Sequence, residues 1–135
     1  MSAFVRQSEV RNEDFAWGLI GWRCTPGGTG TKHLVVLDVS LGPGQAHTFH
    51  RHPGQEEVII VKSGEVEQWL EREVATLGPG DSVFIDADLV HATFNDGNEP
   101  AHLQVVLGPA LDTEIGYGLV DVSGETPWSS LRPAS

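Results

Sequence analysis

The sequence has little of several features, and each scarcity excludes a class of protein. Its only cysteine is Cys24, which excludes internal disulfides and metal sites built from clustered cysteines. It contains no run of about 18 apolar residues, the length that a transmembrane helix needs. Its first residues lack the basic and apolar regions of a signal peptide. We therefore expect a soluble, cytoplasmic protein.

Positive charge is also scarce. The 135 residues include 8 Lys and Arg against 19 Asp and Glu, which gives a formal net charge of −11 at pH 7. Phosphate backbones and anionic membrane surfaces repel such a chain. We therefore expect no nucleic acid and no membrane as partner, and a small molecule as ligand or substrate.

Long helical patterns are missing, apart from room for a short turn within the first fifteen residues. Instead, 16 glycines and 8 prolines separate short runs typical of strands. The predicted strands are residues 16–23, 34–41, 46–50, 57–62, 65–70, 82–85, 91–94, 103–107 and 117–122. Because the connections are too short for parallel crossovers, we predict an all-β, antiparallel sandwich or barrel.

The chain has the length of a single domain. We divide it into an N-terminal segment with the first strands (residues 1–33), a barrel (34–122) and a C-terminal tail (123–135). The tail is predicted to be irregular, with Trp128 fastening it to the barrel.

Histidine is concentrated at one place. His50 and His52 are two residues apart, so on an extended chain their side chains point to the same face. Pro53-Gly54 turns the chain, and Glu57 opens the next strand, where it can lie beside both imidazoles. This ligand set suits iron(II), manganese, nickel, copper or zinc. A His-x-His pattern by itself is also found on exposed, polar strand edges.

Glycines complete a longer pattern around these residues. Gly44-x5-His50-x-His52-x4-Glu57-x6-Gly64 resembles the first motif of the cupin superfamily, with every fixed position filled.

A second pattern follows after 15 residues, a spacing similar to that of small bacterial cupins. Gly80-x5-Asp86-x-Asp88-x2-His91-x3-Asn95 resembles the second cupin motif. Asp86 and Asp88 stand where the family usually has proline and glycine. Aspartate tolerates left-handed turns, so the turn can survive these departures.

The resemblance implies a small, antiparallel jelly-roll β-barrel of the cupin type, often a homodimer. It also implies a divalent transition metal held by His50, His52, Glu57 and His91. His91 enters this set through the resemblance, helped by its place at the start of an apolar strand.

Two assignments stay open at this stage. Either Glu56 or Glu57 could supply the carboxylate, and both the spacing to Gly64 and strand alternation favour Glu57. Asp88 could accept a hydrogen bond from His91 and orient it, or it could be an ordinary solvated loop carboxylate.

Other residues receive simpler interpretations. Strand parity predicts that His47 faces the barrel exterior, and His33 is expected at a solvated strand end. Among the basic residues, only Arg23 could reach the cavity. Phe49, Trp69, Phe84 and Phe94 are expected in the core or an interface.

One late strand has two possible orientations. Leu103, Val105 and Leu107 alternate with His102 and Gln104, and we expect the apolar residues to face the interior. Gln104 would bond a ligand only if the other face points inward.

Three functions are compatible with such a site. The first is a metal-dependent enzyme with dioxygenase-like activity on a small neutral or phenolic molecule, because few basic residues are available to clamp an anion. The second is a non-oxidative metal-dependent isomerase, lyase or hydrolase. The third is a small-ligand-binding module without turnover.

Overall fold

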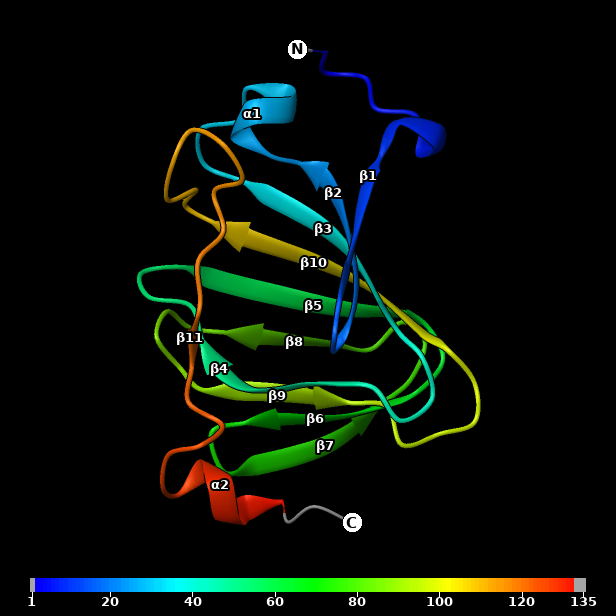
Figure 1. Cartoon of the computed structure of the whole chain (residues 1–135), viewed down its shortest axis with the longest axis vertical. Coiled ribbons are helices and arrows are strands. Elements are labelled where there is room, and N and C mark those ends of the chain that lie inside the picture. The colour runs from blue at the N-terminus through cyan, green and yellow to red at the C-terminus, as the bar shows by residue number, and fades with distance from the viewer. Residues whose placement is uncertain (1, 133–135) are drawn as a thin grey trace.

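The computed structural model describes residues 2–132, most of which lie in short strands or tight turns (Figure 1). The strands are β1 (Arg11–Phe15), β2 (Gly18–Cys24), β3 (Val35–Leu41), β4 (Ala46–Arg51), β5 (Glu56–Ser63), β6 (Val66–Leu70), β7 (Glu73–Leu77), β8 (Ser82–Ile85), β9 (His91–Phe94), β10 (Ala101–Gly108) and β11 (Val120–Asp121). The helical turns are Gln7–Glu9, α1 (Pro26–Thr29) and α2 (Trp128–Leu131).

The strands form two sheets in which every neighbouring pair is antiparallel. One sheet has the order β1-β2-β3-β10-β5-β8 and the other has the order β11-β4-β9-β6-β7 (Figure 1). From β3 onward the chain changes sheet at every connection except the one between β6 and β7. This arrangement confirms the predicted all-β jelly-roll. It also makes β4 and β9 direct neighbours, although about forty residues separate them.

The core lies between the sheets and follows from strand alternation. In β10 the side chains of Leu103, Val105 and Leu107 are at most 4% exposed. Gln104, between them, points to the outer face and donates a hydrogen bond to Asp38. The apolar residues of this strand therefore face the interior, as predicted, and Gln104 does not line the cavity.

Some elements differ from the prediction. β1 and β7 were missed because they are largely exposed edge strands whose sequences show no apolar alternation. The strand predicted over residues 117–122 shrinks to Val120–Asp121. Phe84 is 55% exposed on β8 and does not belong to the core.

The C-terminal segment packs against the second sheet, near the end of the molecule where α2 lies (Figure 1). The ring of Trp128 stacks on Phe49 with 5.8 Å between centroids. The guanidinium of Arg132 lies 3.8 Å from the ring centroid of Phe94 and pairs with Glu67 at 2.9 Å. The predicted role of Trp128 in fastening this segment is confirmed.

No helix within residues 2–132 has the length and apolar character to cross a membrane.

Two motif glycines allow a test of close packing in the barrel. Gly64 and Gly44 both have left-handed backbone, with φ of +80° and +82°. A Cβ on Gly64 would lie 2.5 Å from the carbonyl oxygen of Pro100, whereas a Cβ on Gly44 would meet nothing within 4 Å. We expect Gly44→Ala to lower the free energy of unfolding by about 1–2 kcal/mol, and Gly64→Ala to lower it further. Urea denaturation measures both, and equal losses would contradict the steric argument.

Candidate metal centre

Three strands bring the predicted ligands together. His50 lies near the end of β4, His52 follows that strand directly, and His91 begins β9. His50 and His91 are partners in the register between β4 and β9. Glu57 comes from β5, in the other sheet. Two strands of one sheet and one strand of the other therefore converge on one point.

The three histidines are buried and close together. Their exposed fractions are 4% for His50, 2% for His52 and 1% for His91. One ring nitrogen from each lies within 4.8 Å of the others, so the three are positioned to hold a metal ion. The Oε1 atom of Glu57 lies 2.8 Å from Nε2 of His91 and 3.4 Å from Nε2 of His52.

The backbone orients each of these imidazoles. Each ring places Nδ1 within hydrogen-bond distance of a main-chain carbonyl oxygen. The pairs are His50 with Thr48 (2.6 Å), His52 with Gly118 (2.7 Å) and His91 with Leu89 (3.0 Å). Because a carbonyl oxygen only accepts, Nδ1 carries the proton, and Nε2 is left with a lone pair for a metal.

Two buried atoms lack a hydrogen-bond partner. Within residues 2–132 they are Oε1 of Glu57 and Nε2 of His91, whose 2.8 Å contact lacks hydrogen-bond geometry. Buried polar atoms are rarely left in this state. A divalent transition metal would satisfy both atoms, so the residues of the site fit such an ion.

Burial controls the charges at the site. Burial lowers the pKa of His50 well below its usual value and also lowers that of His52, which favours the neutral form that binds metal. Burial alone would raise the pKa of Glu57 and lower that of His91. Their mutual attraction outweighs burial, so the pKa of Glu57 falls and that of His91 rises.

The structure separates the two candidate carboxylates. Glu56 is exposed, whereas Glu57 is 5% exposed and faces the histidines. The two residues point to opposite faces of β5, as strand alternation requires. Glu57 is therefore the carboxylate that lies beside the predicted ligands.

The hypothesis that Asp88 orients His91 is wrong. The Nδ1 atom of His91 lies against the carbonyl of Leu89, and Asp88 forms an ion pair with Arg51 at 3.3 Å. The φ of Asp88 is +69°. Aspartate thus adopts the left-handed turn conformation at the place where the motif usually has glycine.

The prediction that His47 faces the barrel exterior is also wrong. His47 pairs with Thr93 and His50 pairs with His91, so three steps along β4 match two steps along β9. The extra residue is a β-bulge, which reverses the alternation of side chains. As a result, the His47 ring stacks on the His50 ring with 3.7 Å between centroids. Burial lowers the pKa of His47 to about 3.

The histidines face a small cavity of about 30 Å³. Apolar side chains from β2, β3, β5 and β10 line most of its wall, together with Trp17, Thr93 and Tyr117. Arg23 does not reach this space, because it forms an ion pair with Asp38 at 2.7 Å. Among the described residues, no lysine or arginine lines the cavity.

Two residues near the histidines were missed by the sequence analysis. Gln55 is 1% exposed, and its amide joins the turn before Glu57 to a distant segment. It donates to the carbonyls of Pro109 (2.9 Å) and Gly116 (2.8 Å) and accepts from the amide of Gly118 (3.3 Å). The same segment carries Tyr117, which lines the cavity, and the carbonyl that orients His52. No motif marks either Gln55 or Tyr117.

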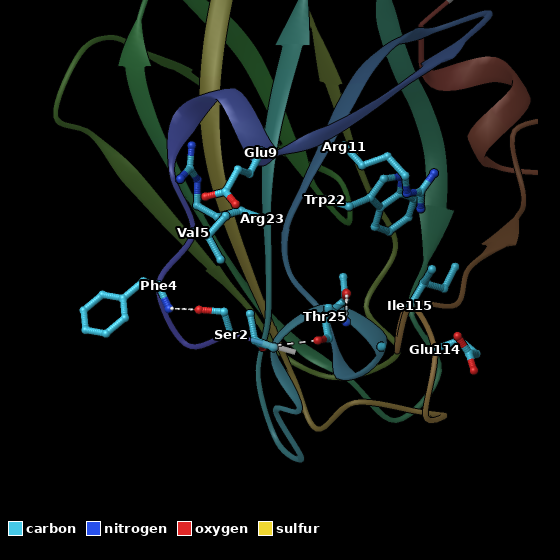
Figure 2. Close-up of a pocket in the computed structure, with 13 residues that line it drawn as sticks. Ser2, Phe4, Val5, Glu9, Arg11, Trp22, Arg23, Thr25, Glu114 and Ile115 are labelled. Carbon is cyan, nitrogen blue, oxygen red and sulfur yellow. Dashed lines mark hydrogen bonds between the residues drawn. The ribbon is translucent and has the colours of Figure 1, made fainter.

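Figure 2 shows a larger pocket, of about 460 Å³, between the N-terminal segment and α1. It shares no lining residue with the histidine cavity. Two of its polar side chains already have partners, since Arg23 pairs with Asp38 and Thr25 accepts from the amide of Gly28. Within residues 2–132, the group of side chains able to hold a metal is at the histidines, so we place the functional site there despite the smaller volume.

Comparison with known families agrees with this geometry. Residues 37–107 match the family model of the cupin domain, and this stretch covers more than half of the chain. The chain belongs to the cupin family. The matched residues of this cupin include His50, His52, Glu57 and His91.

This cupin is similar to auxin-binding protein ABP19b of Prunus persica, with 34% identity over 73 residues. The match covers 50% of this chain and 35% of that protein.

Two solved structures also resemble this chain. KdgF from Halomonas sp. has a TM-score of 0.72 at 20% identity, over 83% of this chain and 97% of KdgF. The DMSP lyase DddQ from Ruegeria pomeroyi has a TM-score of 0.61 at 30% identity, over 70% of this chain and 46% of that one.

The contacts of Gln55 predict a measurable effect on metal binding. Gln55→Ala frees the segment whose carbonyl orients His52, and we expect metal affinity to fall by about tenfold. Competition with a chromophoric chelator measures the change. Gln104→Ala is the matched control, because that amide also donates two hydrogen bonds but lies outside the cavity. Equal losses of affinity in the two variants would contradict a specific role for Gln55.

Burial of the histidines predicts a pH effect on the metal-free cupin. Below the ordinary pKa of 6.5, unfolded His50 and His52 take up protons while the folded forms stay neutral, so stability falls on acidification. The raised pKa of His91 opposes this loss, whereas the lowered pKa of His47 adds to it. We expect His50→Gln to reduce the slope of unfolding free energy against pH between about pH 6.5 and 5, whereas Gln104→Ala, which removes no titratable group, should not. Equal slopes of unfolding free energy against pH in the wild type and both variants would contradict this role of the buried histidines.

Proposed function

We propose that this cupin is a metal-dependent enzyme that carries out a dioxygenase-like oxidation of a small neutral or phenolic molecule. One observation supports this most directly: three oriented imidazoles and a buried carboxylate face a small apolar cavity. His50, His52, His91 and Glu57 would hold iron, manganese, nickel, copper or zinc. A metal bound there would supply a Lewis acid able to activate an organic oxygen atom or dioxygen.

The residues around the ligands have separate tasks in this proposal. The apolar wall lowers the local dielectric constant beside the ligands, which strengthens electrostatic interactions in the cavity. The phenol of Tyr117 also faces this space. Burial, together with the charge of Glu57, raises the pKa of Tyr117 far above its usual value. The phenol therefore keeps its proton at neutral pH and can donate a hydrogen bond to a bound molecule.

The approach to the cavity favours substrates without strong negative charge. Beside the cavity lies an outer space of about 210 Å³, which we call the vestibule and which is lined by Trp17, His47, Thr48, His50, Leu119 and Asp121. Its one carboxylate, Asp121, has a pKa lowered by hydrogen bonds from Ser123. Without a lysine or arginine among these residues, an anionic substrate would find no clamp on its way to the histidines.

Two other functions have specific support. A non-oxidative lyase or isomerase is supported by the 30% identity to the DMSP lyase DddQ and by the protonated phenol of Tyr117, which could donate a hydrogen bond to a negative charge that develops on the substrate. A small-ligand-binding module is supported by the similarity to a protein named for auxin binding. In that case the same cavity would hold a ligand without turnover.

Metal content and oxygen uptake distinguish these functions. We expect elemental analysis of purified protein to find about one transition-metal ion per chain, and His50→Ala to lose it. After reconstitution with iron(II) and, separately, copper, an oxygen electrode should record uptake with members of a panel of small neutral and phenolic compounds.

The controls use the same panel. His102→Ala changes an exposed histidine outside the cavity, so it should keep both metal and oxygen uptake. Products formed equally well without dioxygen would favour the lyase or isomerase. Ligand binding without any product would favour the binding module. The proposal would be overturned if neither the purified protein nor the metal-supplemented protein contained stoichiometric metal.

A further inference from the structure

A stack of four rings leads from the β1–β2 hairpin to the metal centre. Phe15 stacks on Trp17 with 5.6 Å between centroids, and Trp17 stacks on His47 at 3.9 Å with an interplanar angle of 5°. His47 in turn stacks on His50 at 3.7 Å. The hairpin tip is therefore in continuous contact with a predicted metal ligand.

The inner part of this stack separates the cavity from the vestibule. The two spaces have three lining residues in common, which are Trp17, His47 and His50. These side chains form the wall between about 30 Å³ beside the ligands and about 210 Å³ outside. A volume of 30 Å³ is close to the share of one water molecule in liquid water. An aromatic substrate can fill the vestibule but cannot enter the cavity while this wall is closed.

Of the three side chains, Trp17 is the least confined, since His47 lies between the rings of Trp17 and His50. His50 is held through Nδ1 by the carbonyl of Thr48. Within residues 2–132, the indole of Trp17 is held by stacking on Phe15 and His47 and by no hydrogen bond. It is half-buried in the two-residue connection between β1 and β2. A change of its side-chain rotamer breaks no polar contact.

The backbone below Trp17 is fixed, in contrast. A Cβ on Gly18 would lie 2.7 Å from the carbonyl oxygen of Ser40 and 2.9 Å from the side chain of Leu41. The start of β2 therefore packs directly against β3, and the antiparallel pairing of the two strands from Leu19 onward holds it there. Any opening of the wall at the hairpin comes from the Trp17 side chain itself.

We propose that Trp17 is a gate and a specificity-determining residue, whose side chain sets the size of molecule that reaches the three histidines. Water and diatomic molecules pass it in the closed arrangement. A ring-sized substrate enters only when the indole swings away from His47. This proposal rests on the proposed function, since it concerns access to the same metal centre.

The first test uses metal-free protein and does not depend on metal binding. Diethylpyrocarbonate acylates neutral imidazoles, and mass spectrometry gives the rate at each histidine. We expect Trp17→Ala to raise the rate at His91, which lies in the inner cavity, by about tenfold. The rate at exposed His102 should not change and serves as the internal reference. Trp17→Phe keeps a ring against His47 and should remain within about twofold of the wild type.

Trp69→Ala is the matched control. Trp69 is also partly buried, but it packs on Phe49 and lines neither space, so its replacement should leave acylation of His91 unchanged. Equal rates at His91 in the wild type and Trp17→Ala would overturn the gate. An equal increase in Trp69→Ala would overturn it as well, because it would show general loosening.

The second test uses cobalt(II)-loaded protein and two probes of different size. We expect Trp17→Ala to speed the binding of 4-nitrocatechol by about tenfold and that of azide by less than about twofold, because only the larger probe is obstructed. Equal acceleration of both probes would overturn the size filter. If the wild type takes up no stoichiometric metal while acylation of His91 still depends on Trp17, the proposed function fails and the gate stands.

Discussion

The site depends on three hydrogen bonds between imidazole Nδ1 atoms and main-chain carbonyls. They turn the Nε2 atoms of three buried histidines toward one point without using any other side chain. Two of these bonds are local, because the carbonyl belongs to the residue two positions before the histidine. The third joins His52 to Gly118, 66 residues later. Metal binding is therefore coupled to a distant segment of the chain.

The buried amide of Gln55 holds that distant segment in place. A buried amide is costly unless its polar atoms have partners, and here both ends of the amide bond the backbone of residues 109–118. The segment is irregular, so side-chain hydrogen bonds take the place of a strand ladder. The same contacts bring Tyr117 to the cavity wall. Gln55, which lies between His52 and Glu57 in the first motif, therefore also positions Tyr117, which belongs to neither motif.

Electrostatics and packing oppose each other at the centre. Glu57 and His91 lie side by side in an apolar barrel, where removal of polar groups from water is expensive. Their attraction offsets part of this cost, and a bound cation would satisfy the atoms that remain without partners. The apolar wall that makes burial costly also leaves a small space beside the ligands. The site therefore gives up some stability of the metal-free protein in favour of binding.

Much of this centre could be predicted from local sequence. The alternation of apolar residues and the frequent turns determined an antiparallel barrel, and the spacing of His50, His52 and Glu57 determined which side chains share a face. Tertiary structure alone decided the position of His47, because the bulge in β4 appears only when that strand is paired with β9. It also decided the places of Tyr117 and Trp17, which reach the cavity through long-range contacts that leave no periodic pattern in the sequence.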